Sequence, residues 1–542
     1  MPTATRREFL RQASAAALAA PAAVLPARRA SAAQAPTDRL GRSRILVDTR
    51  RTLAALDRRL FGSFLEHLGR AIYGGVYEPG SALADERGFR SDVLEQVRAL
   101  GVPIVRYPGG NFVSGYNWLD GVGPPSERPR VLDKAWNSIE SNRFGTNEFL
   151  SWCKAAGTEP LMAVNLGTGT PEQAAALLEY CNVAQGTQWS ELRRKHGVLE
   201  PHNVRRWCLG NEMDGPWQIG HMPASEYGLK AADAARQMRD VDPSVLLIAC
   251  GSSSPAMPTY LEWDREVLEQ CYEYVDGLSL HRYFTNTQAE TGGDSSRFLA
   301  LNVAMERQIA ESLAVCDLVR GHKRSTKSLW LSFDEWNVWY RTRAAPQRDG
   351  GAREAPPLLE EQYNLEDALL VGGMLNTLMR HADRVKLACL AQLVNVIAPI
   401  MTASAGLWLQ TIFYPYSWVL KFAQGAVLET LVESPGYDAG QPEPVPYIDA
   451  AGTIDPQTGA VALFILNRDL SNVREVEIRW QDRPPSRVLT AQVLTGEDLK
   501  AANSFESREQ VRPRLLDRPQ SGAGATTFRL PPRSYSVIQM GA

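Results

Sequence analysis

The chain has 542 residues, of which 44% are hydrophobic and 22% are charged, and its formal net charge is −3 at pH 7. This length exceeds what one simple core can hold and predicts two domains, one of them large. The near-zero charge, with no long basic block, argues against a nucleic-acid partner.

The first 32 residues have the features of a targeting segment. Arg6-Arg7 precedes an alanine-rich apolar stretch at 13–25, and 30–32 reads Ala-Ser-Ala, a pattern typical of signal-peptide cleavage sites. The apolar stretch is too short and too weak to span a membrane, so we expect no membrane partner. Residues 1–32 therefore predict a twin-arginine signal peptide and export to the periplasm or the medium.

The sequence carries no recognisable metal or cofactor motif. Its seven cysteines have no Cys-x-x-Cys spacing and fall mostly in apolar runs, which predicts buried free thiols. There is no His-Glu-x-x-His, and 167–170 lacks the third glycine of a dinucleotide fingerprint. We expect no cofactor and no metal. A redox enzyme stays a rival interpretation only because the twin-arginine route often carries cofactor enzymes.

Strand-like apolar runs alternate with amphipathic segments over residues 59–425. The expected strands are 60–67, 102–107, 161–166, 206–212, 246–251, 275–283, 329–335 and 385–392. The expected helices are 91–100, 147–156, 171–183, 224–241, 260–271, 296–320 and 361–382. Eight strands alternating with helices predict a (β/α)8 TIM barrel, in the α/β class.

The pattern changes from about residue 426. Short alternating segments such as 461–467 and 473–478 follow one another between glycines and prolines, without a long helix. This predicts a C-terminal antiparallel β-sandwich over 426–542, which strands within 43–58 would join. A polar insertion at 344–357 is expected to form a mobile loop near the site.

Two of the strand-like runs end in glutamate. Glu212 lies in Gly-Asn-Glu-Met-Asp-Gly, and Glu335 precedes Trp-Asn. Residues at the C-terminal ends of barrel strands face the catalytic mouth. A glycosidase needs two such carboxylates, one to protonate the leaving oxygen and one to attack the anomeric carbon. One glutamate alone would be more typical of a surface or helix-start residue.

Six segments together resemble glycoside hydrolase family 51, most closely its α-L-arabinofuranosidases. They are 61–75, 106–118, 210–215, 279–283, 334–339 and 391–395. The resemblance covers the whole barrel, with weaker motifs in the sandwich. It implies a retaining hydrolase that removes terminal α-L-arabinofuranosyl residues from arabinose-containing polysaccharides or oligosaccharides by double displacement.

The resemblance also implies residue roles. Glu212 would be the general acid/base, which requires a pKa high enough to hold a proton at working pH. Glu335 would be the ionised nucleophile, with its carboxyl group about 5–5.5 Å from that of Glu212. Asn211 would donate a hydrogen bond to the sugar 2-OH, and Tyr283 would hydrogen-bond the nucleophile.

Three more polar residues map onto family positions around the sugar. Glu66, Asn111 and Gln392 would bind the furanose hydroxyls, since carboxylates and amides suit groups that both donate and accept. An alternative for Glu66 is a barrel salt bridge with Arg70 or Arg106.

The remaining predicted site residues have structural alternatives. Arg106 would orient the nucleophile or Glu66, or serve as a charge partner inside the barrel. His281 would contact the acid/base or be a structural imidazole. Trp136 and Trp339 would form aromatic walls of the pocket, with core packing as the alternative for each.

Other functions stay open at this point. The same barrel could serve a β-xylosidase or an endo-glucanase, and a non-catalytic carbohydrate-binding protein is the alternative from another class. The family resemblance also implies a homo-hexamer. A signal peptide is less usual in this family, because many members are intracellular.

Overall fold

The computed structural model describes residues 42–340, 352–482, 484–522 and 524–541. The predicted signal peptide, 1–32, and most of the insertion predicted at 344–357 lie outside these ranges. Within them, every helix is too short or too polar to cross a membrane.

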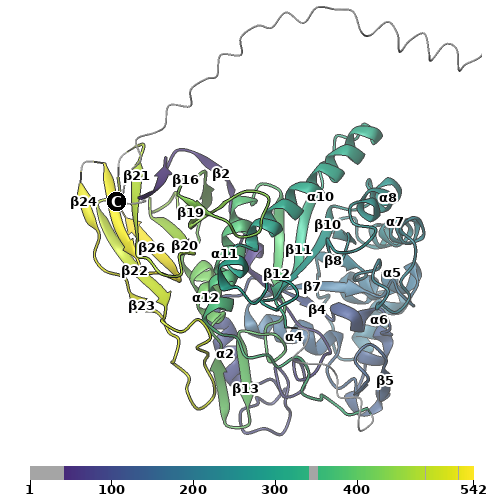
Figure 1. Cartoon of the computed structure of the whole chain (residues 1–542). Helices are drawn as coiled ribbons and strands as arrows, with labels where there is room; N and C mark the ends of the chain where they lie inside the picture. The colour runs from purple at the N-terminus through teal and green to yellow at the C-terminus, as the bar shows by residue number, and fades with distance from the viewer. Residues whose placement is uncertain (1–41, 341–351, 483, 523, 542) are drawn as a thin grey trace, which may run out of the picture. The chain divides into compact units, whose positions relative to one another are not determined.

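Eight parallel strands close into a barrel in the order β10-β11-β12-β3-β4-β7-β8-β9 (Figure 1). They are β3 (Gly62–Phe64), β4 (Ile104–Tyr107), β7 (Glu159–Val164), β8 (Arg206–Leu209), β9 (Leu246–Cys250), β10 (Gly277–Phe284), β11 (Trp330–Val338) and β12 (Val385–Leu390). Each strand falls within or overlaps its predicted run. The predicted TIM barrel is confirmed.

Helices surround the barrel and follow the predicted order. They are α2 (Ser91–Leu100), α4 (Thr146–Ala156), α5 (Pro171–Asn182), α7 (Ala224–Val241), α8 (Glu262–Cys271), α10 (Asn302–Lys323) and α11 (Leu365–Arg380). Two further helices, α6 (Gln188–Lys195) and α12 (Phe413–Phe422), were not predicted from the sequence.

The helix predicted at 296–320 is divided in two. A short α9 (Ser295–Phe298) ends before α10 begins at Asn302. The carbonyl of Leu299, in the break, accepts a hydrogen bond of 2.9 Å from Arg468 Nε. Because Arg468 comes from the C-terminal sheets, a distant contact accompanies the break, and local sequence periodicity could not reveal it.

The C-terminal region forms two sheets. One has the strand order β2-β15-β19-β20-β26-β22-β23 and the other β16-β1-β21-β25-β24. Their strands are β1 (Ser43–Val47), β2 (Thr52–Ala55), β15 (Ala426–Leu428), β16 (Leu431–Glu433), β19 (Ile448–Ile454), β20 (Val461–Asn467), β21 (Arg474–Trp480), β22 (Arg487–Thr495), β23 (Arg514–Leu515), β24 (Gln520–Gly522), β25 (Ala525–Leu530) and β26 (Ser534–Gly541).

The two N-terminal strands enter different sheets. β1 pairs with β16 and β21, and β2 pairs with β15. The β1–β21 ladder is parallel, whereas the other ladders of these two sheets are antiparallel. Apolar residues from both sheets, including Ile45 and Ile478 of one sheet and Leu463 of the other, form one buried cluster. The N-terminal segment therefore helps to join the sandwich across its core.

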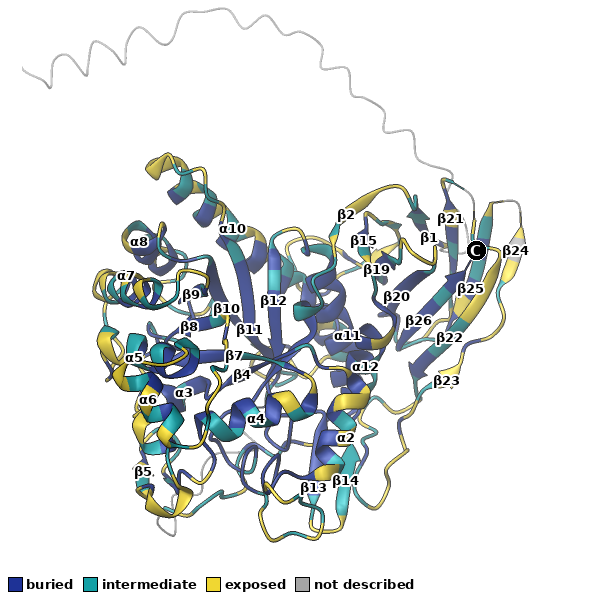
Figure 2. Ribbon diagram, turned by 180° about the vertical axis from the view of Figure 1, so that it is seen from behind, coloured by how far each residue is buried: buried dark blue, intermediate teal, exposed yellow. Residues whose placement is uncertain are grey.

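The barrel and the sandwich meet along α11, which is buried over most of its length (Figure 2). An ion-pair network crosses this contact. Asp449 of β19 lies 3.1 Å from Arg380 of α11 and 2.9 Å from Arg468. Asn376 donates a further hydrogen bond of 2.8 Å to Asp449. Arg468 is 1% exposed, so its charge depends on this carboxylate for compensation.

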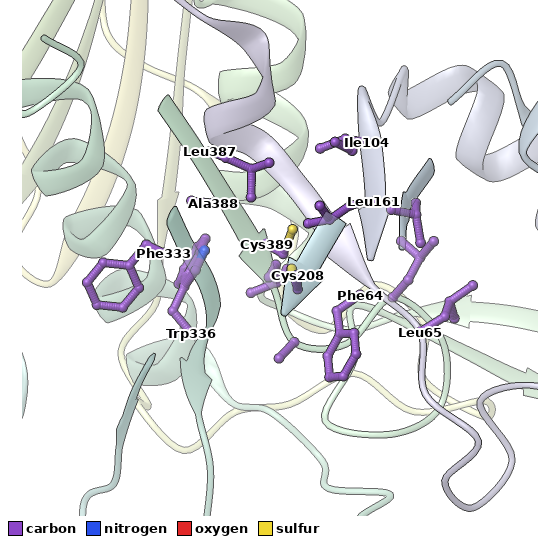
Figure 3. Packing of buried hydrophobic residues seen from close by; sticks show 14 of the residues in the cluster. Phe64, Leu65, Ile104, Leu161, Cys208, Phe333, Trp336, Leu387, Ala388 and Cys389 are labelled. Carbon is purple, nitrogen blue, oxygen red and sulfur yellow. The ribbon is translucent and has the colours of Figure 1, made fainter. Parts of the chain in front are cut away.

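Apolar packing holds the barrel strands in place. Figure 3 shows part of this cluster, with Ile104, Leu161, Cys208 and Cys389 contributed by four strands of the barrel. All seven cysteines are buried free thiols, as predicted.

Candidate active site

Strand β11 directs two neighbouring carboxylates into the polar centre of the barrel. Residues 279–281 of β10 pair with residues 332–335 of β11, so β11 contains one extra residue at this point. Such a β-bulge re-aims side chains and is frequent beside active sites. Both Asp334 and Glu335 consequently reach Arg106, which comes from β4 on the other side of the barrel.

Glu212 lies in a tight turn just after β8. Its backbone is in the left-handed region, with φ of 43°, which is uncommon for a residue other than glycine. The turn closes with a hydrogen bond of 2.9 Å from Gly215 N to Glu212 O. Glu212 Oε1 is 2.8 Å from His281 Nδ1, and Oε2 accepts a 2.7 Å bond from Trp217 Nε1. Both carboxylate oxygens therefore have defined partners.

The two predicted catalytic glutamates converge. One nitrogen or oxygen atom each from Glu212, His281 and Glu335 lie within 4.8 Å of one another. Retaining glycosidases place their carboxyl groups about 5–5.5 Å apart, whereas inverting enzymes need roughly 6.5–9.5 Å for a water molecule. The spacing is that of double displacement. The Arg106 guanidinium, 2.6 Å from Glu335 Oε1, makes this group unfavourable for a metal ion.

Glu335 is held from two sides. Arg106 Nη1 donates to Oε1 at 2.6 Å, and Tyr283 donates to Oε2 at 2.8 Å. Arg106 Nη2 also donates to Asn211 Oδ1 at 2.7 Å, which fixes the plane of that amide. Among the described residues, Asn211 Nδ2 is buried without a hydrogen-bond partner. Of the two orientations predicted for Arg106, the contact with Glu335 is the one observed.

Glu66 lies in a separate, buried part of the site. Its Oε1 accepts bonds from Trp136 Nε1 at 2.8 Å and from the Phe112 amide at 2.9 Å, and Gln392 Nε2 is 3.5 Å from Oε2. Burial is the main cause that raises the pKa of Glu66, to about 8, and the charge of Glu335 adds to it. Burial therefore favours the protonated form of Glu66 at neutral pH.

The alternative salt bridge for Glu66 is wrong. Arg70 pairs with Glu360 at 2.6 Å, and Arg106 pairs with Asp334 at 3.1 Å and Glu335 at 2.6 Å. Both arginines thus have other carboxylate partners, which leaves Glu66 directed into the cavity.

These side chains surround a cavity of about 440 Å³. Its lining includes Glu66, Asn111, Trp136, Glu212, Trp217, Met257, Tyr283, Glu335, Trp339, Leu359 and Gln392. Trp136 lies between β5 (Val131–Asp133) and β6 (Ser138–Glu140), and Trp339 packs edge-to-face on Tyr283 at 5.2 Å. Asn211, Arg106 and His281 lie behind the lining as buried supports.

Several lining residues were not predicted from the sequence, among them Trp217, Met257 and Leu359. Trp217 follows Glu212 by five positions, in a Gly-Pro-Trp turn, and its side chain is half exposed at the cavity mouth. An aromatic residue this close to a catalytic candidate was a usable signal. Met257 and Leu359 come from loops whose paths the sequence does not reveal.

Glu212 and His281 shift each other's pKa in opposite directions. Burial, the largest influence, acts to raise the pKa of Glu212, but the hydrogen bonds from His281 and Trp217 and the imidazole charge outweigh it and lower the pKa. Burial opposes the charge on His281, yet Glu335, Glu212 and Asp334 raise its pKa to about 9. The lowered pKa of Glu212 and the raised pKa of His281 favour an ion pair with the proton on His281 in the free enzyme.

A TIM barrel that brings two carboxylates this close at the C-terminal ends of β8 and β11 defines a retaining glycoside hydrolase. Two family models match the chain: the α-L-arabinofuranosidase 1 domain over residues 96–297 and the α-L-arabinofuranosidase C-terminal domain over residues 334–534. The chain belongs to glycoside hydrolase family 51 and is an α-L-arabinofuranosidase.

Individual relatives support this assignment. An intracellular exo-α-(1→5)-L-arabinofuranosidase from Acetivibrio thermocellus is 48% identical over 92% of this chain and 99% of its own length. The structure of a family 51 α-L-arabinofuranosidase from Bifidobacterium longum matches with a TM-score of 0.88 and 40% identity, covering 92% of this chain and 99% of that one. A Thermotoga maritima α-L-arabinofuranosidase in complex with arabinose matches at 0.80 and 35%, covering 92% and 100%.

The same comparisons decide between the alternative functions. A bifunctional glucanase-xylanase matches with a TM-score of 0.56 but only 13% identity, so it shares the fold alone. The relatives at 44–48% identity are named arabinofuranosidases, which supports this activity over the xylosidase, glucanase, redox and non-catalytic interpretations.

The predicted export is wrong. Four bacterial relatives, 46–48% identical over 92% of this chain, are named intracellular enzymes. The prediction depended on 1–32 alone, where an arginine pair before an alanine-rich stretch is a short compositional signal. Agreement over the rest of the chain outweighs it.

Proposed function

We propose that Glu335 is the nucleophile and Glu212 the acid/base of this retaining arabinofuranosidase. The observation that carries the proposal is the approach of the two side chains and His281 to within 4.8 Å of one another. Glu335 is the one held by a guanidinium and a phenol, which suits a carboxylate that must stay ionised and aimed. Glu212 is near the half-exposed Trp217, where a leaving group would depart.

The proposed reaction has two displacements. In the first, Glu335 attacks the anomeric carbon while Glu212 protonates the glycosidic oxygen, which leaves as an alcohol. In the second, Glu212 removes a proton from water, the oxygen of that water bonds to the same carbon, and the ester to Glu335 breaks.

The furanose would be recognised by the buried polar groups. Asn211 Nδ2 has no partner among the described residues and is a ready donor for the sugar 2-OH. Glu66 and Gln392 are linked at 3.5 Å and, together with Asn111, line the cavity for the other hydroxyls. Trp136, whose indole also holds Glu66, would form an aromatic wall.

Trp339 would form the second aromatic wall, since it lines the cavity and packs on Tyr283.

Two relatives at 48% identity are named exo-α-(1→5)-L-arabinofuranosidases, and one from Bifidobacterium longum at 44% is named exo-α-(1→6). We extend the first specificity to this chain, acting on arabino-oligosaccharides released during hemicellulose degradation. Arabinose release from α-(1→5)- and α-(1→6)-linked disaccharides, with an aryl xyloside as control, tests this choice.

The domain division and the assembly complete the proposal. The catalytic barrel would span 59–425 and the sandwich 426–542, with strands from 43–58 joining the sandwich. Support comes from the placement of β1 and β2 in the two C-terminal sheets. The homo-hexamer rests on the family resemblance, and light scattering on the purified protein measures it directly.

Azide rescue tests the two catalytic roles. In Glu335→Ala, azide should occupy the space left by the carboxylate and convert an activated aryl arabinofuranoside into the inverted glycosyl azide. In Glu212→Ala, azide should instead attack the glycosyl ester and give the retained azide. Full activity without azide in Glu335→Ala, or the two azide products exchanged between the variants, would show the assignment to be wrong.

A further inference from the structure

A chain of hydrogen bonds runs from the barrel interior to Glu212. Asp334 Oδ1 accepts a bond of 2.5 Å from Ser279 Oγ, and Ser279 Oγ is 3.3 Å from His281 Nε2. The other ring nitrogen, His281 Nδ1, is 2.8 Å from Glu212 Oε1. Asp334, His281 and Ser279 are 0%, 2% and 7% exposed, so bulk water does not replace these contacts.

The direction of each bond follows from the number of hydrogens available. Asp334 as a carboxylate only accepts, so the single hydroxyl hydrogen of Ser279 is used on it. Ser279 Oγ must then accept from His281, which requires a hydrogen on Nε2. The one remaining variable is the hydrogen between His281 Nδ1 and Glu212. It lies on nitrogen in an ion pair, or on oxygen in a neutral pair.

We propose that Ser279 and Asp334 are positioning residues that hold His281 as the Nε2–H tautomer, so that its Nδ1 stores the proton that Glu212 delivers to the leaving group. The inference deepens the proposed function and depends on Glu212 being the acid/base. His281 touches no sugar in this scheme, because it acts through Glu212.

The charges around the imidazole favour this storage. From β11, Glu335 Oε2 lies 3.6 Å from Nδ1, and Asp334 Oδ1 lies 3.8 Å from Nε2. Glu212 faces the ring from the end of β8. Arg106 of β4 is the cation that pairs with both β11 carboxylates. Three carboxylates and one guanidinium leave a net negative charge around the ring, which stabilises a protonated imidazole and agrees with the raised pKa of His281.

The proton balance closes over both displacements. In the first, Nδ1 gives its proton to Glu212 as Glu212 protonates the leaving oxygen; the carbon–oxygen bond breaks and the ester to Glu335 forms. His281 is then neutral and Glu212 is ionised. Esterification also removes the charge of Glu335, which is the largest influence that raises the pKa of the imidazole. The proton consequently stays off the imidazole until Glu212 takes one from water, and breaking the ester restores the starting state.

Ser279→Ala tests the chain, with Ser332→Ala as a matched control. Ser332 is a fully buried serine on β11 whose hydroxyl has no hydrogen-bond partner in the described part of the chain. Without the Ser279 hydroxyl, the imidazole can place its hydrogen on Nδ1 and donate permanently to ionised Glu212. Ser279→Thr keeps the hydroxyl and should behave like the parent enzyme.

The measurement is kcat/KM against pH for two aryl arabinofuranosides. With a poor leaving group, 4-methoxyphenol, Ser279→Ala should lose about tenfold or more, because general acid catalysis is worth about 10²–10⁴. With 2,4-dinitrophenol, which leaves without protonation, the loss should stay within about threefold. The alkaline limb should move down by about one pH unit, the size expected from one hydrogen bond.

The outcomes separate this inference from the function on which it rests. One outcome is that Glu212→Ala shows the leaving-group dependence while Ser279→Ala matches Ser332→Ala in kcat/KM for both substrates and in the position of the alkaline limb. That result would refute the role of the hydrogen-bond chain from Asp334 but not the acid/base role of Glu212. If Glu212→Ala itself shows no leaving-group dependence, the acid/base role of Glu212 and the inferred role of Ser279 and Asp334 are both refuted. A Ser279→Thr variant as impaired as Ser279→Ala would also contradict the role of the hydroxyl.

Discussion

Asn211 offers a sharp test of transition-state recognition, because its amide oxygen is hydrogen-bonded whereas its amide nitrogen has no partner among the described residues. Oδ1 accepts from Arg106 Nη2 at 2.7 Å, and the residue is 1% exposed. Turning the amide would therefore leave Arg106 Nη2 without its acceptor. Nδ2 is buried and has no partner among the described residues, so it has a hydrogen available for the proposed bond to the sugar 2-OH.

Asn211→Asp removes the Nδ2 donor while keeping an oxygen for Arg106. A buried donor aimed at a group that becomes more acidic in the transition state is worth about 10²–10³ in rate, comparable to one oxyanion-hole donor. We expect kcat/KM for an aryl arabinofuranoside to fall by about that factor. Asn211→Ala should fall further, since it also leaves Arg106 Nη2 without its acceptor.

Measuring both enzymes on the 2-deoxy analogue of the substrate completes a double-mutant-type cycle, in which the enzyme and the substrate are each changed once. The added carboxylate charge of Asn211→Asp acts on both substrates, so the ratio of the two losses isolates the hydrogen bond to the 2-OH. With the 2-deoxy substrate, the parent enzyme should already be slow and Asn211→Asp should cost little more. An equal loss on both substrates would refute the assigned contact.

Two further predictions concern stability. The raised pKa of Glu66, about 8, means that the unfolded chain releases this proton well before the folded one, so stability falls as pH rises from about 4.5 to 8. Glu66→Gln cannot ionise, so it should raise the urea midpoint at about pH 7.5, where the ionisation of Glu66 lowers the free energy of unfolding by roughly 4 kcal/mol. Near pH 4.5 the midpoint should stay unchanged, and activity should fall. An equal shift of the midpoint at both pH values would contradict this. The pKa of Asp449 is lowered, by Arg380 and Arg468 against the effect of burial, so its contribution is present above about pH 4 and disappears in acid. Asp449→Ala should cost about 3–5 kcal/mol in urea unfolding at neutral pH, and a cost below about 1 kcal/mol would refute the importance of the network.

Much of the fold was predictable because its signals are local. The predicted helices at 91–100 and 224–241 have the same bounds as α2 and α7. Apolar spacing alone determines such segments, as in α2, where Val93, Leu94, Val97 and Leu100 are buried. The α9–α10 break could not be predicted in this way, because the contact that accompanies it joins the Leu299 carbonyl to Arg468 of the sandwich, far away in the chain.

In the active site, too, some features could be predicted from local sequence and others could not. Glu212 and Glu335 could be found because each ends an apolar run, and the family motifs supplied their neighbours. The inward direction of both Asp334 and Glu335 could not be found, since strict alternation would place neighbouring side chains on opposite faces. It depends on the register of β11 against β10, which no local pattern specifies. The ion-pair state of Glu212 and His281 likewise arises from charges on three strands.

Trapping the glycosyl-enzyme in Glu212→Ala tests the central claim most directly. With a 2,4-dinitrophenyl arabinofuranoside, the first displacement needs no acid, whereas the second lacks its base, so the ester should accumulate. Mass spectrometry of the digested protein should find one pentosyl group on the peptide that contains Glu335. A label on the peptide that contains Glu66, or no covalent intermediate together with an inverted product, would contradict the account.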